Sequence, residues 1–169
     1  IVARVTWLTT QCCIQQNDRV LLWTTICFDV AVTEVWSALS TGACGIICPD
    51  PARPPMHNAT CAGFVPSFYL NLPSEELQTT RCVWIAGESL SRIPDQLPYE
   101  LFNIYGPTEA SVYSTWHHCL PGRHGSIPIG KPLPHTLCYV VHPDDGTLCP
   151  PGIAGELWIG GAGVARGYH

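Results

Sequence analysis

Short apolar runs that end at turn residues recur along the first two thirds of the chain, and they constrain its fold most strongly. Residues 20–25 form one such run, and residues 29–39 then carry apolar side chains at helical spacing up to the helix-ending Gly42. A second apolar run follows at residues 43–48 and stops at a Pro-Asp-Pro sequence. This strand–helix–strand order predicts an α/β fold with a parallel sheet.

The predicted secondary structure changes along the chain. Three further strands are predicted before Ser111, at residues 62–65, 81–86 and 101–105, and Pro66 is expected to open a short helix. After Ser111 only strands are predicted, at residues 112–118, 136–142 and 156–159. We therefore expect a parallel-type sheet layer flanked by helices over about residues 1–111, followed by a β-rich part over about residues 112–169.

Composition excludes several classes of protein. Hydrophobic residues make up 46% of the chain and charged residues only 12%, which favours a folded core over intrinsic disorder. The net charge of −5 argues against a nucleic-acid partner, and no apolar window is long enough for a membrane span. The ten cysteines contain no CxxC pair, so we expect reduced thiols, no zinc site and a cytoplasmic protein.

Asp29 lies between two apolar stretches and allows two interpretations. It could cap the N-terminus of the following helix, which its position favours, although Val32 stands where a capping box needs Glu. Alternatively, it is a carboxylate in an apolar pocket that awaits a cationic ligand, because an unpaired buried carboxylate is costly.

The string NIYGPTE at residues 103–109 is the most specific in the chain. It brings an aromatic ring, a turn, a hydroxyl and a carboxylate to the end of a predicted strand, where ligands of open α/β sheets bind. Tyr105 could stack on a purine, Thr108 could bond a phosphate oxygen and Glu109 could hold Mg²⁺. An exposed Gly-Pro turn with polar ends fits the pattern about equally well.

At this string the sequence closely resembles the amino-acid adenylation domains of nonribosomal peptide synthetases, in the adenylate-forming superfamily. Four other strings agree in the same order: FDVAVTEVWSALSTGA, WIAGES, IPIGKP and GELWIGGAGVARGY. The resemblance covers most of the chain from Asp18 onward. It implies part of the N-terminal subdomain of an enzyme that activates an α-amino acid with ATP and passes the aminoacyl group to a carrier-domain thiol.

The resemblance also implies roles for individual residues. Thr108 would contact the α-phosphate and Glu109 would bind Mg²⁺, so that both take part in catalysis. Asp29 would pair with the α-ammonium group of the substrate, which replaces the capping interpretation. Six residues would contact the nucleotide: Ala86, Gly87, Glu88, Tyr105, Gly106 and Thr108.

A substrate side-chain pocket is implied as well. Beside Asp29 its lining would be Val30, Thr33, Phe64, Trp84, Ala86, Ile104, Val112 and Tyr113. Because this lining carries no charge, we expect a small or medium uncharged side chain and rejection of charged ones. Phosphopantetheine on a carrier domain, and a condensation domain of the same assembly line, would be the partners.

The sequence departs from the family pattern in places. Only 15 residues, rich in proline, separate Cys48 from Phe64, where the family has a full helix. The family's phosphate loop would precede Ile1, and the subdomain with the catalytic lysine would follow His169, so we expect this piece to be inactive alone. A non-catalytic or degenerate remnant is one alternative, and an acyl- or aryl-CoA ligase-like enzyme is another.

Overall fold

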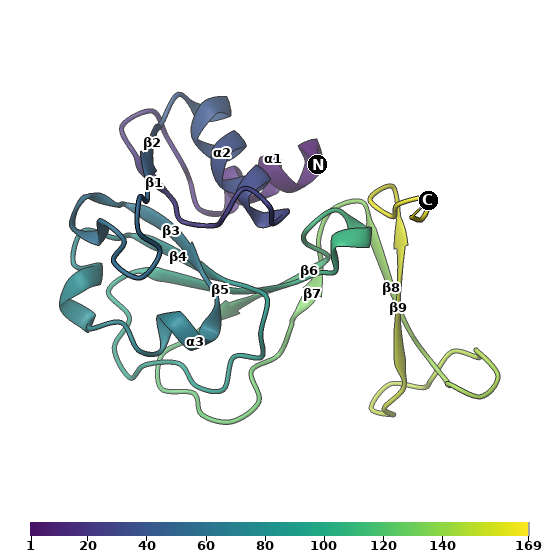
Figure 1. The fold of residues 1–169 in the computed structure, drawn as a ribbon. Coiled ribbons are helices and arrows are strands. Elements are labelled where there is room, and N and C mark those ends of the chain that lie inside the picture. Colours follow the sequence, from purple (N-terminus) through teal and green to yellow (C-terminus); the bar gives the residue numbers. More distant parts are fainter. Residues whose placement is uncertain (169) are drawn as a thin grey trace.

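The computed structural model describes residues 1–168 and is built on a seven-stranded mixed sheet (Figure 1). The strand order is β2-β1-β3-β4-β5-β6-β7. The strands are β1 (Arg19–Leu22), β2 (Cys44–Ile47), β3 (Cys61–Phe64), β4 (Cys82–Ile85), β5 (Glu100–Tyr105), β6 (Thr115–Cys119) and β7 (Lys131–Pro132). β1 to β5 run parallel, as predicted, and β6 and β7 are antiparallel.

Two helices cover one face of the sheet (Figure 1). They are α1 (Val2–Gln11) and α2 (Val30–Thr41), and α2 ends at Gly42 with a left-handed φ of 72°, as the sequence predicts. Leu8 of α1 is fully buried in one core cluster with Trp84 of β4 and Ile104 of β5. Burial of such large apolar side chains contributes about 1.5–3 kcal/mol each, so this interface is a main source of stability.

The opposite face is covered by short elements rather than full helices. These are α3 (Pro66–Tyr69), which begins with Pro66 as predicted, and two 3₁₀ turns, η1 (Met56–Asn58) and η2 (Ser74–Leu77). The crossover from β2 to β3 contains only η1, whose Met56 is 1% exposed and fills the apolar layer. In place of the helix that the sequence lacks here, one 3₁₀ turn with a buried methionine covers the sheet.

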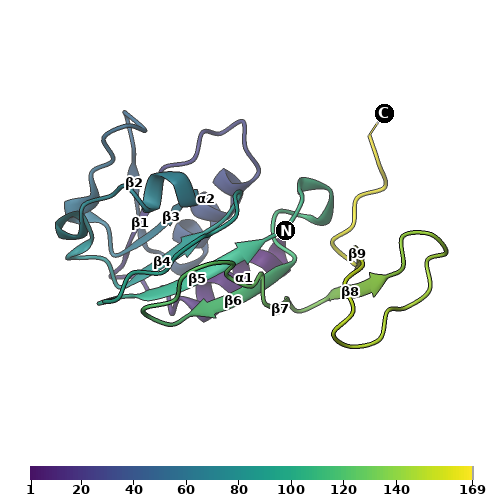
Figure 2. The ribbon, with the colours of Figure 1, turned by 90° about the horizontal axis from the view of Figure 1, so that it is seen from below.

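A separate two-stranded hairpin follows the sheet. It pairs β8 (Thr136–Val141) with β9 (Glu156–Gly161), and both views show it extending away beyond β7 (Figures 1 and 2). The expected change near residue 111 is not a change of sheet, because β6 pairs with β5 over five residues. The independent β unit starts at β8, where the hydrogen bonding to the large sheet ends.

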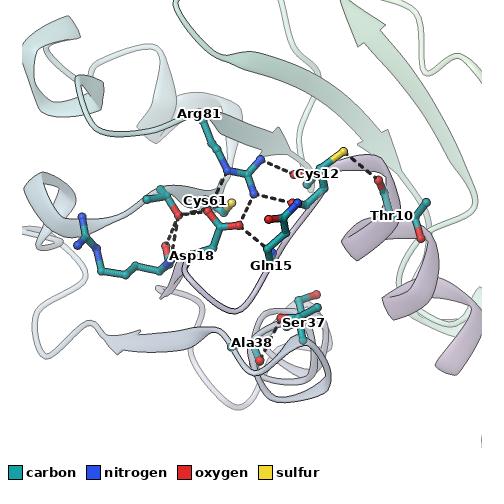
Figure 3. Close-up of polar contacts among 12 residues, drawn as sticks. Thr10, Cys12, Gln15, Asp18, Ser37, Ala38, Cys61 and Arg81 are labelled. Atoms are coloured by element: carbon teal, nitrogen blue, oxygen red, sulfur yellow. Dashed lines mark hydrogen bonds and ion pairs between the residues drawn. The ribbon is translucent and has the colours of Figure 1, made fainter.

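An ion pair between the buried Asp18 and the partly exposed Arg81 ties together the strand ends opposite the predicted site (Figure 3). Arg81 bonds both carboxylate oxygens of Asp18 and donates to the carbonyls of Cys12 (2.6 Å) and Cys13 (2.9 Å). Asp18 also accepts from the Thr60 hydroxyl at 2.8 Å. Burial alone would raise the pKa of Asp18, but hydrogen bonds, with that from Arg81 the strongest, hold this pKa below its usual value.

Among the described residues 1–168, none of the helices combines the length and the apolar character that crossing a membrane requires.

Replacing Arg81 with Met should lower the free energy of unfolding by about 2–3 kcal/mol, because it leaves the buried Asp18 carboxylate without its cation. Urea denaturation at neutral pH measures the change. The control is Arg123→Met at an exposed turn, which should change stability by less than about 0.5 kcal/mol. Equal effects of the two substitutions would contradict the structural role of the ion pair.

Candidate functional site

Four parallel strands, β1, β3, β4 and β5, end at the same edge of the sheet, and two cavities open there. The first cavity has a volume of about 430 Å³ and the second about 390 Å³. Gly87 and Glu88, directly after β4, line both of them. The two cavities are therefore neighbours, at the edge where open α/β sheets bind their ligands.

The first cavity is apolar. Its walls include Trp23, Phe28, Val30, Phe64, Trp84 and Ala86. Glu88 is the only ionisable side chain in this wall, and it accepts hydrogen bonds from the backbone N–H and the hydroxyl of Ser67, both at 2.9 Å. A ligand group placed in this cavity meets mainly aromatic and aliphatic surface.

The predicted side-chain pocket divides between the cavity and the core beneath it. Val30, Phe64, Trp84 and Ala86 line the first cavity, whereas Ile104 lines the second. Thr33, Val112 and Tyr113 line neither cavity and are buried. The Thr33 and Tyr113 hydroxyls lie 3.2 Å apart, and burial raises the pKa of Tyr113, which keeps its phenol neutral.

Phe64 and Trp84 lie on opposite faces of the sheet, although both reach the first cavity. In the β3–β4 register Trp84 pairs with Gly63, and a Cβ on Gly63 would lie 2.1 Å from the indole nitrogen. Phe64 therefore belongs to the other core, with its ring centroid 5.5 Å from that of Trp23. Strand alternation explains the separation, since neighbouring residues point to opposite faces.

The NIYGPTE segment borders the second cavity. Tyr105 ends β5 and is 40% exposed, and Gly106 begins the turn into η3 (Thr108–Ala110). A Cβ on Gly106 would lie 2.5 Å from the carbonyl oxygen of Val112. The turn can therefore fold back onto the start of the next segment only with glycine here, which leaves Thr108 and Glu109 exposed at the edge.

Asp29 directly precedes α2 and Glu109 lies in η3, and neither Asp29, Thr108 nor Glu109 lines either of the two cavities. The phenol of Tyr168 donates a hydrogen bond of 3.0 Å to Oε1 of Glu109. This bond raises the pKa of Tyr168, and the negative charge of Asp29 contributes to the same shift. Asp29 occupies the N-cap position of α2, as the capping interpretation expects, but its side chain makes no capping hydrogen bond.

Glu34 is a site-supporting residue that the sequence reasoning missed. It lies on the buried face of α2, 1% exposed, and accepts from the Thr24 backbone N–H (3.0 Å) and the Thr24 hydroxyl (2.6 Å). Thr24 lines the first cavity, so Glu34 holds part of its wall. A signal was available, because Glu34 shares the buried stripe of Ala31 and Ala38 at helical spacing.

Comparison with known proteins identifies the family of this chain. The sequence profile of a family described as "AMP-binding enzyme" matches residues 1–169. Phosphinothricin tripeptide synthetase PhsB of Streptomyces viridochromogenes is 41% identical over 89% of this chain, which spans 14% of that protein. Zwittermicin A synthase ZmaJ of Bacillus cereus is 31% identical over 99% of the chain, which spans 37% of its length.

Solved structures share the fold. The N-terminal subdomain of Klebsiella oxytoca NpsA in complex with 3-hydroxybenzoyl-AMSN has a TM-score of 0.78 and 28% identity, covering 99% of this chain and 47% of that one. Vibrio cholerae adenylation domain AlmE, in complex with glycyl-adenosine-5'-phosphate, has a TM-score of 0.83 at 22% identity. It covers 98% of this chain and 36% of its own, and at this identity it supports the fold alone.

Stability should depend on the ionisation of Glu34. Burial raises its pKa to about 7, above the ordinary value of 4.5 expected in the unfolded chain. The folded state therefore favours the protonated carboxyl, and this stabilisation is complete below pH 4.5 and is lost as the pH rises through 7. We expect a loss of about 3 kcal/mol across that window.

Urea denaturation between pH 4.5 and 8 checks this dependence. Glu34→Gln mimics the protonated carboxyl and should remove the fall, whereas Glu75→Gln at an exposed position should keep it. If the free energy of unfolding falls with pH by the same amount in the unsubstituted chain and in Glu34→Gln, the ionisation of Glu34 does not control stability.

Gly106→Ala should distort the turn before η3, because the new methyl group meets backbone atoms that cannot move aside. We expect a loss of about 2 kcal/mol or more in the free energy of unfolding, as for other overpacked sites. Gly160→Ala is the matched control, since its Cβ would meet only Leu137 at an ordinary 3.7 Å. A Gly106→Ala variant as stable as Gly160→Ala would refute the close approach at this turn.

Proposed function

Since the chain belongs to the family of AMP-binding enzymes, we propose that it forms the substrate-binding part of a ligase that activates an α-amino acid with ATP in nonribosomal peptide synthesis. The observation that carries the proposal is the pair of adjoining cavities at the carboxyl edge of the parallel strands, both lined by Gly87 and Glu88. One cavity would take the amino acid and the other the nucleotide.

The nucleotide is assigned to the second cavity. Tyr105 would stack on the adenine, beside the Ala86-Gly87-Glu88 turn that separates the two cavities. Thr108 is exposed at the start of η3, where its hydroxyl could donate to an α-phosphate oxygen. Gly106, which lines this cavity, lets the backbone turn tightly two residues before Thr108.

The donor chemistry at η3 fits a magnesium ion. Mg²⁺ prefers one or two carboxylates together with phosphate oxygens. The exposed side chain of Glu109 provides one such carboxylate. When bound, the ion would neutralise negative charge on the phosphate oxygens. Glu109 would hold the nucleotide in place through the bound Mg²⁺. Thr108 would orient the phosphate toward the amino-acid cavity.

The first cavity is assigned to the amino acid. Asp29 would accept the α-ammonium group, a charge-assisted interaction that a carboxylic acid without an amine cannot make. The side chain would rest against Val30, Trp84 and Ala86. These walls contain no cation, so an acidic side chain would lose its hydration without compensation, and a basic one would find only Glu88. A small or medium uncharged side chain fits best.

The partners follow from this reaction. The aminoacyl group would pass to the phosphopantetheine thiol of a carrier domain, and a condensation domain would use it next. One solved relative is described as NpsA-ThdA, an artificially fused adenylation–PCP di-domain from Klebsiella oxytoca, with 28% identity and a TM-score of 0.77. It covers 94% of this chain and 33% of its own, and a carrier partner for this chain is proposed on that likeness.

Activation of an aryl acid is the second candidate function. The NpsA subdomain, 28% identical, is described in complex with 3-hydroxybenzoyl-AMSN and with 3-hydroxyanthranilyl-AMSN. The apolar walls of the first cavity would also suit an aromatic ring. Asp29 distinguishes the candidates, because a neutral aryl group would leave its carboxylate without a cation.

Calorimetric binding of acyl sulfamoyladenosines, stable mimics of the acyl adenylate, tests the proposal. The chain should bind the alanyl compound about 10- to 100-fold more tightly than the propionyl compound, which lacks only the amine. Asp29→Asn should abolish this difference, whereas Asp144→Asn, at an exposed hairpin turn, should preserve it. Aspartyl, glutamyl, lysyl and arginyl compounds should bind more weakly than the alanyl compound.

Other results would overturn the proposal. Equal binding of alanyl and propionyl compounds, or tighter binding of the hydroxybenzoyl compound, would favour an aryl or acyl substrate. Failure of every compound to bind to the folded chain would favour a remnant without substrate-binding function.

A further inference from the structure

The segment after β9 returns to the candidate site. It leaves the hairpin at Gly161 and is fastened to η3 by two hydrogen bonds. The Ser111 hydroxyl donates to the carbonyl of Gly163 at 2.7 Å, and the backbone N–H of Ala165 donates to the carbonyl of Glu109 at 2.7 Å. The segment is therefore held against the residues that carry the proposed metal ligand.

Close packing reinforces these bonds. A Cβ on Gly163 would lie 2.6 Å from the guanidinium of Arg4 and 3.0 Å from the carbonyl oxygen of Ala110. Arg4 is 3% exposed and donates to the carbonyls of Pro134 (3.0 Å) and Ala110 (3.4 Å). Helix α1, η3 and the returning segment thus meet around one buried arginine, which limits how far the segment can shift.

At the end of this segment, Tyr168 contacts the Glu109 side chain. Its phenol donates to Oε1 of Glu109 at 3.0 Å, although the residue is 81% exposed and 59 positions away in the sequence. Glu109 lies in the three-residue turn η3, and its side chain is exposed. The acceptor in this bond is Oε1 of the carboxylate and not Oε2.

We propose that Tyr168 is a positioning residue that orients Glu109 for Mg²⁺ held with ATP. This inference rests on the proposed function, because Glu109 is the metal ligand only in that function. Hydrogen bonds that orient a metal-binding side chain raise metal affinity by reducing the freedom lost on binding. Donation from the phenol also draws electron density from Oε1, which opposes the gain, but Oε2 keeps its full donor strength.

The test compares two tyrosine variants. Tyr168→Phe removes only the hydroxyl that contacts Glu109, and Tyr139→Phe removes a hydroxyl of similar chemistry from the exposed side of β8. ATP binding is measured by calorimetry at increasing Mg²⁺ concentration, and Mn²⁺ binding to the ATP complex is followed by electron paramagnetic resonance. Neither measurement requires turnover.

Tyr168→Phe should raise the Mg²⁺ concentration for half-maximal ATP binding by about 3- to 10-fold, less than for a buried outer-shell partner because this pair is exposed. ATP binding without metal should stay unchanged, which a general loss of structure would not allow. In a Glu109→Gln background, Tyr168→Phe should cause no further change, because the carboxylate that it orients is gone.

Two different results would overturn the assignment. If the unsubstituted chain binds Mg²⁺ with ATP but Tyr168→Phe behaves like Tyr139→Phe, Tyr168 has no positioning role and the proposed function stands. If the unsubstituted chain binds no ATP at any Mg²⁺ concentration, the proposed function fails and the assignment of Tyr168 fails with it.

Discussion

Parallel alignment of β1, β3, β4 and β5 is the constraint on which the rest of the structure depends. Because their carboxyl ends meet at one edge, residues far apart in sequence, such as Glu88 and Tyr105, come to line the same cavity. The Gly87-Glu88 turn after the central β4 separates two cavities there without isolating them. A reaction between an amino acid and a nucleotide requires this kind of adjacency, in which two binding sites share one wall.

Ionisable side chains with buried carboxyl groups fix both ends of this arrangement. At the strand starts, Arg81 joins Asp18 to the chain after α1, so that α1, β1, β3 and β4 are held together (Figure 3). At the site end, Glu34 fastens Thr24 without a cationic partner, and burial raises its pKa as a result. Such polar anchors cost desolvation but specify one geometry, which apolar packing alone does less well.

The sequence was sufficient for the fold class, an α/β fold with a mostly parallel sheet. Local patterns predicted α2 with its Gly42 end, the parallel strands and the strand end at Tyr105, because turn residues act over short ranges. The apolar spacing predicted the helix but not its buried face, since Trp36 and Leu39 are exposed. The sequence did not reveal that Phe64 and Trp84 lie on opposite faces, since register decides this. The contact of Tyr168 with Glu109 was also missed, because only tertiary folding brings them together.

The central claim is that one ligand spans both cavities, with its ammonium group at Asp29 and its adenine at Tyr105. A crystal structure of the chain with alanyl sulfamoyladenosine tests this most directly. The account predicts the ammonium nitrogen within about 3 Å of the Asp29 carboxylate and the adenine stacked on the ring of Tyr105. A ligand bound away from the carboxyl ends of β4 and β5, or one with its amine directed away from Asp29, would contradict it.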